Sequence, residues 1–257
     1  MPESPQASPA GGDRRVVVTR RVEQASLFGD KLRAAGFRPV NFPTIELQAV
    51  TEPALDHVLS QIENYDWLLF SSANGVNFFF RRLDELKLSP RLPRTAVVGS
   101  ATASTLAEYH IRPDFMPDSF TGEALAAGLG NLTGKHILLP RARLGRPQIV
   151  TMLRSQGALV TDIALYETLT ADPEPAALEQ LALGYEAITF ASPSSVRGFL
   201  DISGNKPIGS AVVACIGPVT AETAVEYGLP VPLVADEYTL DGLVQVLTRH
   251  FGESKYE

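Results

Sequence analysis

The chain has 257 residues, of which 45% are hydrophobic and 20% are charged, and its formal net charge is −7. This composition is typical of a globular protein with a full core, and no apolar run reaches the roughly 20 residues that a membrane helix needs. The acidic balance argues against a broad nucleic-acid-binding face, which requires clustered Lys and Arg.

Cysteine and histidine usage indicates the cellular compartment and argues against a metal site. The single cysteine, Cys215, cannot form an internal disulfide and fits a reducing compartment, so we expect a cytoplasmic protein. The four histidines lie far apart without metal-ligand spacing, so no metal site is expected. Residues 1–13 are rich in Pro, Ser, Ala and Gly, and they predict a disordered leader.

Strand-like and helix-like segments alternate along the chain. Near-continuous apolar strands separated by helices indicate parallel sheets with helices on both faces, which is an α/β fold. Short β-branched apolar runs predict strands at Val16–Thr19, Trp67–Phe70, Thr95–Val98, His136–Leu139, Ala187–Phe190 and Val212–Ile216. Amphipathic stretches predict helices that include Gln24–Ala35, Val76–Leu86 and Ala221–Tyr227.

The second half of the sequence repeats the first. VVVTRR recurs 121 residues later as ILLPRA, and this pairs Arg20 with Arg141. DWLLFSSANGV recurs after 120 residues as EAITFASPSSV, and AVVGSATA recurs after 118 residues as ACIGPVTA. Pattern mimicry between strands does not readily explain matched Arg, Ser, Gly and Thr at strand ends. The sequence therefore predicts an internal duplication into two similar α/β domains, with the simplest division near Thr133.

Polar residues and glycines gather where the predicted strands pass into helices. In open parallel sheets, ligands bind at the carboxyl ends of the strands, and helix N-termini bind anions. The same residues also cap helices, so capping and carboxylate or phosphate binding both remain open. The candidates are Arg20, Ser71, Ser72, Ala73, Asn74, Gly99 and Thr102 in the first half, and Arg141, Ser192, Ser194, Gly217, Thr220 and Ala221 in the second.

Familiar nucleotide and hydrolase signals are missing. No predicted strand is followed by G-x-G-x-x-G, and GLGNLTGKH at Gly128–His136 lacks the P-loop residues at two positions. The serines have no neighbouring His and acid in the sequence, which argues against a serine hydrolase.

The motifs taken together resemble the uroporphyrinogen-III synthase family. They occur in order from about Arg15 to His250, and they read VTR, NFPTIEL, DWLLFSSANGV, VVGSATA, PDSFTGEAL, IALYETL, ASPSSV, CIGPVTAETA and TLDGLVQVL. The resemblance implies two domains joined by a two-stranded β linker. One domain would combine Arg14–Phe42 with Asp172–His250, and the other would run from Val50 to Val160. The linkers would be Pro43–Ala49 and Thr161–Ala171.

The resemblance also implies an activity and a site. A lyase of this family cyclises hydroxymethylbilane to uroporphyrinogen III, with inversion of ring D and loss of water, in haem, sirohaem, chlorophyll and cobalamin biosynthesis. It needs no cofactor, acts as a monomer, and has hydroxymethylbilane synthase as a transient partner. Tyr166 matches the tyrosine of the family's cleft, where a phenol would assist the departing hydroxyl, and the candidates above would bind the substrate. The chain departs from the family in two places. Arg21 stands where the family commonly has proline, and the first serine motif reads SSANG in place of the more usual threonine-serine start.

Two functions of other classes remain open at this stage. One is a two-domain receptor for an anionic ligand, built like a periplasmic receptor. The single cysteine fits a reducing compartment and so argues against export. The other is a transferase that uses a nucleotide-sugar donor, although no charged cluster for the nucleotide stands out in the sequence.

Overall fold

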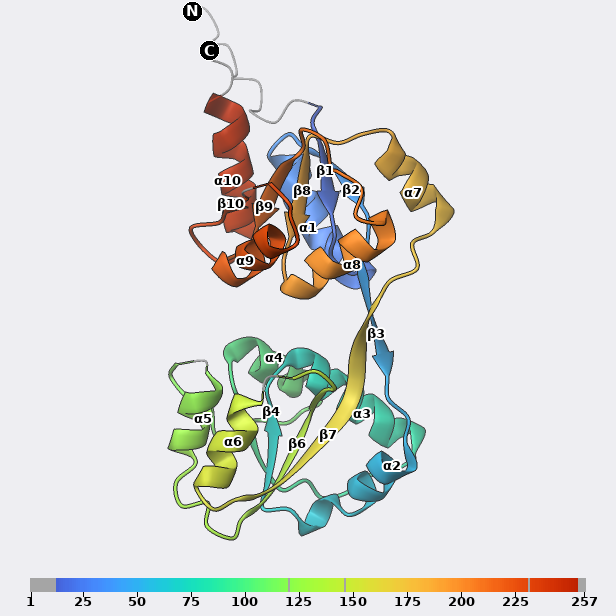
Figure 1. Cartoon of the computed structure of the whole chain (residues 1–257). Helices are drawn as coiled ribbons and strands as arrows, with labels where there is room; N and C mark the ends of the chain where they lie inside the picture. Colours follow the sequence, from blue (N-terminus) through green and yellow to red (C-terminus); the bar gives the residue numbers. More distant parts are fainter. Residues whose placement is uncertain (1–12, 120, 146, 231, 254–257) are drawn as a thin grey trace, which may run out of the picture. The chain divides into compact units, whose positions relative to one another are not determined.

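A computed structural model describes residues 13–119, 121–145, 147–230 and 232–253, so the predicted leader lies almost wholly outside the described residues. The chain divides into two compact units, Met1–Glu46 with Leu169–Glu257 and Leu47–Thr168 (Figure 1). The division near Thr133 is wrong, because this residue lies inside the second unit and the first strand of the chain pairs with a strand near residue 188. None of the described helices is long and apolar enough to cross a membrane.

The first unit is built on a five-stranded sheet in the order β10-β9-β8-β1-β2. Each of its neighbouring strand pairs is parallel. Its elements are β1 (Arg15–Val18), α1 (Val22–Ala34), β2 (Arg38–Asn41), α7 (Pro175–Ala182), β8 (Ala187–Phe190), α8 (Pro193–Ser203), β9 (Val212–Cys215), α9 (Pro218–Glu226), β10 (Leu233–Val234) and α10 (Leu240–Glu253).

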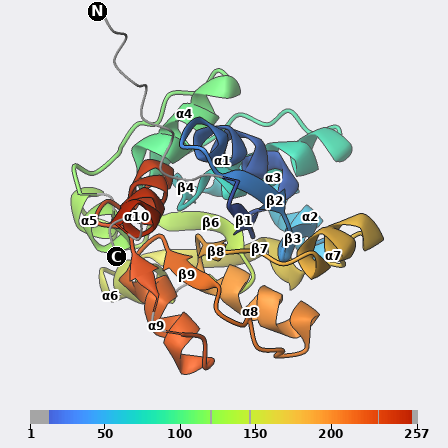
Figure 2. The same ribbon diagram turned by 90° about the horizontal axis from the view of Figure 1, so that it is seen from above.

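Alternation along the strands divides the core of the first unit into two layers. Val16 and Val18 pack with α1 and α10 on one face, while Val17 packs with α7, α8 and α9 on the other. The view from above shows α1 and α8 on opposite sides of β1 (Figure 2). Because both faces are covered, β1, β8 and β9 are apolar over most of their length, as the sequence predicted, whereas the edge strand β2 carries exposed Arg38 and Asn41.

The second unit contains a five-stranded sheet in the order β3-β7-β6-β4-β5. β4 pairs in parallel with β5 and β6, and β6 pairs in parallel with β7. Its elements are β3 (Ile45–Ala49), α2 (Pro53–Ser60), the 3₁₀ helix η1 (Ile62–Asn64), β4 (Trp67–Phe70), α3 (Ala73–Glu85), β5 (Arg94–Val97), α4 (Ser100–Glu108), α5 (Gly122–Gly128), β6 (His136–Ala142), α6 (Gln148–Ser155) and β7 (Leu159–Thr170).

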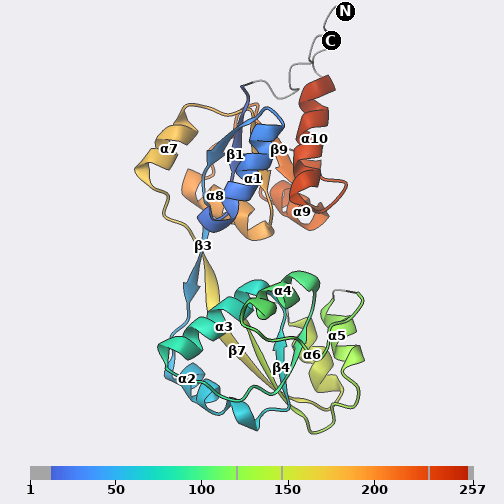
Figure 3. The ribbon, with the colours of Figure 1, turned by 180° about the vertical axis from the view of Figure 1, so that it is seen from behind.

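The second core is layered in the same way. Leu68 and Phe70 of β4 pack with α2, α3 and α4, whereas Trp67 and Leu69 pack with α5 and α6 (Figure 3). Helices therefore cover both faces of this sheet too, and the predicted α/β fold with parallel sheets flanked by helices is confirmed.

Candidate functional site

The predicted strand-to-helix positions are helix N-termini in the structure. Ser72 is the N-cap of α3, and its Oγ accepts a hydrogen bond of 3.1 Å from the Gly75 amide. Ser192 is the N-cap of α8 and forms a reciprocal capping box with Ser195. Gly99 and Gly217 are the N-caps of α4 and α9. Capping thus accounts for part of what these serines do.

Four of the predicted residues come together at the carboxyl ends of β4 and β6. Ser71, Ser72, Arg141 and Tyr166 line a hollow of about 450 Å³ in the second unit. The other lining residues were not expected from the sequence, and they are Val98, Thr121, Gly122, Glu123, Ala142, Gly145, Gln148 and Ile149. The PDSFTGEAL motif contains three of them, and this was the available signal.

Tyr166 lies on β7 with only 5% of its surface exposed. Its hydroxyl is 3.2 Å from Ser72 Oγ, at hydrogen-bond distance. The ring stacks on Phe78 of α3, with centroids 4.7 Å apart and planes 15° from parallel. The guanidinium of Arg81 lies 4.6 Å from the centroid of the Phe78 ring. The two residues with which the tyrosine makes these contacts therefore come from α3 and its N-cap.

Arg141 follows the buried part of β6 and is held by Asp162. Its Nε and Nη2 donate to the two carboxylate oxygens at 2.6 Å each, which is a bidentate pair. The side chain of Arg141 is 11% exposed. Gly145 approaches it closely, since a Cβ at this glycine would lie 2.5 Å from Nη1 of Arg141. The sequence alone did not reveal Asp162, which lies 21 residues further along the chain.

The remaining candidates of the second unit do not line this hollow. Ala73 and Asn74 form the first turn of α3, next to Ser72. Gly99 precedes α4, and Thr102 in its first turn is buried. These residues follow β4 and β5 at the same edge of the sheet as the hollow, as predicted.

In the first unit, the candidates follow β1, β8 and β9 at one edge of the sheet. Arg20 is half-buried, and its Nη2 donates to Gln24 Oε1 at 3.0 Å. Its Nε is buried and has no hydrogen-bond partner among the described residues. Burial, with the charge of Arg21 second, lowers the pKa of Arg20. An anion at this guanidinium would offset both costs. The other candidates here are Ser192, Ser194, Gly217, Thr220 and Ala221.

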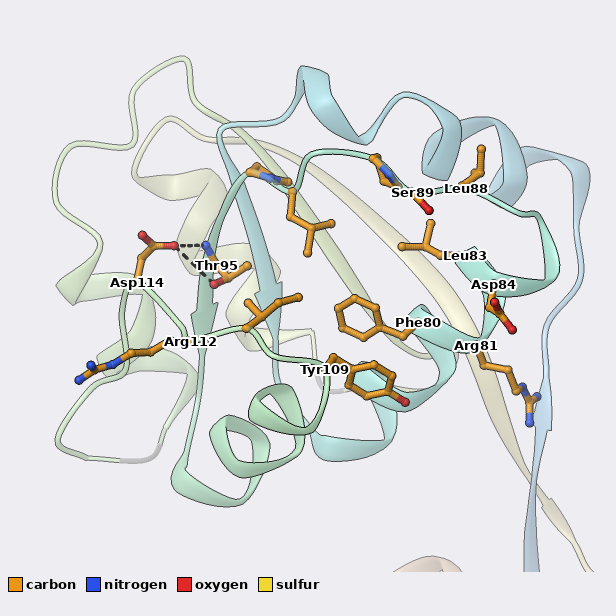
Figure 4. A pocket seen from close by; sticks show the side chains of 14 residues that line it. Phe80, Arg81, Leu83, Asp84, Leu88, Ser89, Thr95, Tyr109, Arg112 and Asp114 are labelled. Carbon is orange, nitrogen blue, oxygen red and sulfur yellow. Dashed lines mark hydrogen bonds between the residues drawn. The ribbon is translucent and has the colours of Figure 1, made fainter.

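A larger hollow of about 830 Å³ lies elsewhere in the second unit (Figure 4). Its wall is mixed: it includes Leu83, Leu88 and the stacked rings of Phe80 and Tyr109, 4.2 Å apart, together with the charged residues Arg81, Asp84, Arg112 and Asp114. It opens beside Thr95, near the amino end of β5, and none of the predicted residues lines it. Volume alone does not identify the site, because parallel sheets bind ligands at the opposite strand ends.

The described residues contain no group of three or more His, Cys, Asp or Glu side chains that could share a metal ion. Groups that could bind a ligand or transfer a proton include the phenol of Tyr166, the hydroxyl of Ser72, the carboxyl group of Glu123, the guanidinium groups of Arg20 and Arg141, and the helix N-termini.

Known proteins are similar over most of this chain. The family model described as uroporphyrinogen-III synthase HemD matches residues 27–245. A uroporphyrinogen-III synthase of Synechococcus elongatus is 34% identical, over 90% of this chain and 93% of its own length. The porphyrin biosynthesis protein HemD of Ruminiclostridium josui is 32% identical over 95% of this chain, which spans only 50% of that protein.

A solved structure shares the fold. The uroporphyrinogen-III synthetase of Helicobacter pylori 26695 superposes with a TM-score of 0.66 at 21% identity, over 93% of this chain and 99% of that one. The match of the family model and the relative from Synechococcus elongatus lead to one conclusion: this chain belongs to the uroporphyrinogen-III synthase family.

Proposed function

We propose that this chain converts hydroxymethylbilane to uroporphyrinogen III, with loss of water and inversion of ring D. The observation that carries the proposal is the phenol of Tyr166, which lines a hollow at the strand ends together with Ser72 and Arg141. The chain's family membership supplies the substrate class, because the relative from Synechococcus elongatus is a uroporphyrinogen-III synthase.

Tyr166 assists the departure of the substrate hydroxyl. The C–O bond of the hydroxymethyl group breaks, and its electron pair leaves on the oxygen, which takes the phenol proton and departs as water. The pyrrole nitrogen stabilises the azafulvene-like cation that remains. The substituted carbon of the far pyrrole attacks this cation to give a spiro intermediate, which breaks and recloses with ring D inverted. The proton released as the macrocycle regains aromatic pyrroles restores the phenol.

Carboxylate groups of the substrate bind at helix N-termini and arginines. Backbone amides at the starts of α3, α4, α8 and α9 face the strand ends, where the helix dipole favours anions. Arg20 is the stronger of the two arginine candidates, because its Nε has no partner among the described residues. Arg141 is already paired with Asp162 and serves mainly to shape the hollow around Tyr166.

The two units arose from one ancestral unit by duplication. The first sheet has the order β2-β1-β8-β9-β10, and the second runs β7-β6-β4-β5 in the corresponding positions. A parallel bridge of Ala96 with Phe115 takes the place of β10 beside β5. The sequence offsets pair β1 with β6, β8 with β4 and β9 with β5, in agreement with this order.

The duplicated units are joined by a two-stranded β linker. β3 and β7 are neighbouring strands, and the backbone bonds Val50 N to Leu165 O and Ala171 N to Thr44 O lie on either side of β3. The boundaries of the compact units, after Glu46 and after Thr168, fall within the predicted linkers 43–49 and 161–171. Domains at 14–42 with 172–250 and at 50–160 follow from this organisation.

The protein works as a monomer in the cytoplasm, with hydroxymethylbilane synthase as its transient partner. Support for a reducing compartment comes from the single buried thiol of Cys215. Support for the partner is chemical. Because the linear substrate cyclises spontaneously to the wrong isomer, direct transfer from hydroxymethylbilane synthase to this protein would limit that loss.

One assay tests the proposed function. Hydroxymethylbilane is generated in situ, and the uroporphyrinogen isomers are separated with and without the purified protein. Isomer III in excess over isomer I is expected only with the protein. If isomer I alone forms in both reactions, the proposed activity is wrong, and an anion-binding role becomes the better interpretation.

A further inference from the structure

We propose that Phe78 is a positioning residue that holds the phenol of Tyr166 in its productive orientation, an inference that rests on the proposed function. Phe78 lies on α3, and its ring stacks on Tyr166 with centroids 4.7 Å apart and planes 15° from parallel. The Arg81 guanidinium also lies over the Phe78 ring, 4.6 Å from its centroid.

The stack and the N-cap together fix the two degrees of freedom that matter for proton transfer. Phe78 sets the plane of the Tyr166 ring, because rotation of the ring would break the parallel contact. Ser72 sets the direction of the Tyr166 hydroxyl, whose oxygen lies 3.2 Å from Ser72 Oγ. Ser72 is in turn immobilised by the Gly75 amide, which donates to it at the start of α3. One rigid helix thus orients both the ring and its hydroxyl, as a preorganised site requires.

The other half of the molecule shows that the fold does not need this stack. The offset of 121 residues places Ile45 at the position of Tyr166, and the offset of 120 places Gly198 at that of Phe78. There the chain closes up instead, since a Cβ at Gly198 would lie 2.2 Å from the carbonyl oxygen of Thr44. An aliphatic residue beside a glycine fills the same place in one unit, and a stacked aromatic pair fills it in the other. The stacked pair therefore occurs in the unit in which the residue at this position carries a hydroxyl, whereas the other unit has isoleucine and glycine there.

The test is a double-mutant cycle with a matched control. Phe78→Leu removes the stack but keeps an apolar side chain. Phe80→Leu is the control, because Phe80 lies on the same helix and also stacks on a tyrosine, Tyr109, at 4.2 Å. Both are combined with Tyr166→Phe, and kcat, KM and the melting temperature are measured in the isomer assay. Phe78→Tyr retains a stacking ring and provides a conservative rescue.

We expect Phe78→Leu to lower kcat by about 3- to 10-fold, the effect of roughly 0.7–1.4 kcal/mol of lost orientation, with KM within about twofold. Phe80→Leu and Phe78→Tyr should keep turnover close to that of the wild type. The variant Phe78→Leu/Tyr166→Phe should be no slower than Tyr166→Phe alone, because the stack acts only through the phenol.

Each contrary result has a distinct meaning. Independent, multiplicative losses in the double variant, or equal losses in Phe78→Leu and Phe80→Leu, overturn the positioning role and leave the proposed function standing. If Phe78→Leu keeps wild-type turnover while Tyr166→Phe is slow, the positioning role is likewise overturned and the proposed function stands. A wild-type protein that makes no isomer III overturns the proposed function, and this inference with it.

Discussion

Ser72 serves two partners with one hydroxyl. A serine hydroxyl can donate one hydrogen bond and accept two. Its Oγ accepts from the Gly75 amide, which leaves both a proton and a lone pair for the phenol of Tyr166. In the proposed mechanism Ser72 donates to the phenol oxygen, and the phenol proton then points at the departing hydroxyl of the substrate. The pair can therefore switch between a resting and a donating arrangement by rotation of two hydroxyl groups, without movement of heavier atoms.

The first prediction concerns Tyr166→Phe, which keeps the ring and removes only the hydroxyl. We expect turnover to fall by about 10- to 100-fold, at or below the low end of the usual contribution of a general acid, because the phenol assists departure and is not indispensable. The melting temperature should change little, because the stack on Phe78 survives. The product should remain mostly isomer III, and the isomer assay measures both quantities. Unchanged turnover would show that the tyrosine only packs.

A second prediction concerns the glycine beside Arg141. In Gly145→Ala the added methyl would lie 2.5 Å from Nη1 of Arg141, which Asp162 holds in place through two bonds. The guanidinium must move and lose part of its bidentate geometry, so we expect KM to rise about 3- to 10-fold with an unchanged fold. Steady-state kinetics and circular dichroism check this outcome.

Gly29→Ala is the matched control for that change. A Cβ at Gly29, inside α1, would meet its nearest atom at 3.5 Å, an ordinary contact. This variant should retain wild-type kinetics and gain up to about 1 kcal/mol, since alanine favours helix over glycine. A rise in KM in both variants would mean that the effect does not arise at Arg141.

The sequence predicted residues that line one hollow, but not the contacts among them. Ser72, Arg141 and Tyr166 were expected, and they line the same hollow. Their partners were not, because Ser72 and Tyr166 are 94 residues apart and nothing local indicates that they meet. Phe78 stands in a run of three phenylalanines, which by itself suggests only a buried helix face. Pairing of this kind is decided by which strands become neighbours.

At the scale of elements, the same limit shows in helix boundaries. The strands Trp67–Phe70 and Ala187–Phe190 are as predicted, since their apolar runs are buried on both faces. Helices α1, α3 and α9 begin two or three residues before the predicted positions. The first turn of α3 holds Ala73 and Asn74, which continue no apolar period, and the valines in the first turns of α1 and α9, Val22 and Val219, are exposed. Short strands such as β10 were missed because two residues show no pattern.

The third prediction concerns the N-cap of α8. Ser192→Ala removes the half of the capping box in which Ser192 Oγ accepts from the Ser195 amide and keeps the half donated by the backbone of residue 192, so it should destabilise the protein by about 1 kcal/mol. If the freed amides also bind a substrate carboxylate less well, turnover should fall by no more than about tenfold. Urea unfolding and the isomer assay separate the two effects. Complete loss of turnover in the folded variant would assign this serine a chemical role and contradict a purely backbone-mediated contact.

A fourth prediction concerns the contact of α8 with the segment before β3. In Gly198→Ala the new methyl would lie 2.2 Å from the carbonyl oxygen of Thr44, which is backbone and cannot swing away. The Thr44 hydroxyl donates to the Ser195 carbonyl at 3.0 Å, so this segment is also tied to α8. We expect destabilisation of about 1–3 kcal/mol, as overpacking of a core usually causes, measured by chemical denaturation. A neutral result would mean that β3 shifts freely.

At the scale of the whole molecule, the proposed duplication followed by divergence would account for the asymmetry of the proposed chemistry. The linear substrate has one hydroxymethyl end and so needs one proton donor. Each half keeps the capped helices that suit carboxylates, but only the second carries the Tyr166–Ser72 pair. The sequence predicted the repeat through matched residues. It did not predict which half would hold the stack on Tyr166, because this contact has no counterpart at Ile45 and Gly198. The edge-on pair Phe70–Phe79, in contrast, recurs as Phe190–Phe199.

The fifth prediction concerns pH and the first unit. Burial raises the pKa of the Cys215 thiol from 9.0 to about 12. A pKa raised by folding favours the protonated, folded state, so this contribution is intact below pH 9 and is lost as the pH rises towards 12. The unfolding free energy should fall across that window, and less steeply in Cys215→Ala. Burial also raises the pKa of Tyr185, with the same sign, but this group is present in both proteins. Equal slopes would contradict the prediction.

The chain carries one tryptophan and one cysteine, and each marks a different unit. Trp67 is buried in β4 of the second unit, and Cys215 is buried in β9 of the first. The indole fluorescence of a single residue therefore reports the melting of one unit, while reaction of a single thiol with a colorimetric reagent reports the melting of the other. Without any label or engineered probe, a denaturant titration read in both channels would reveal whether the two halves lose their structure together or in succession.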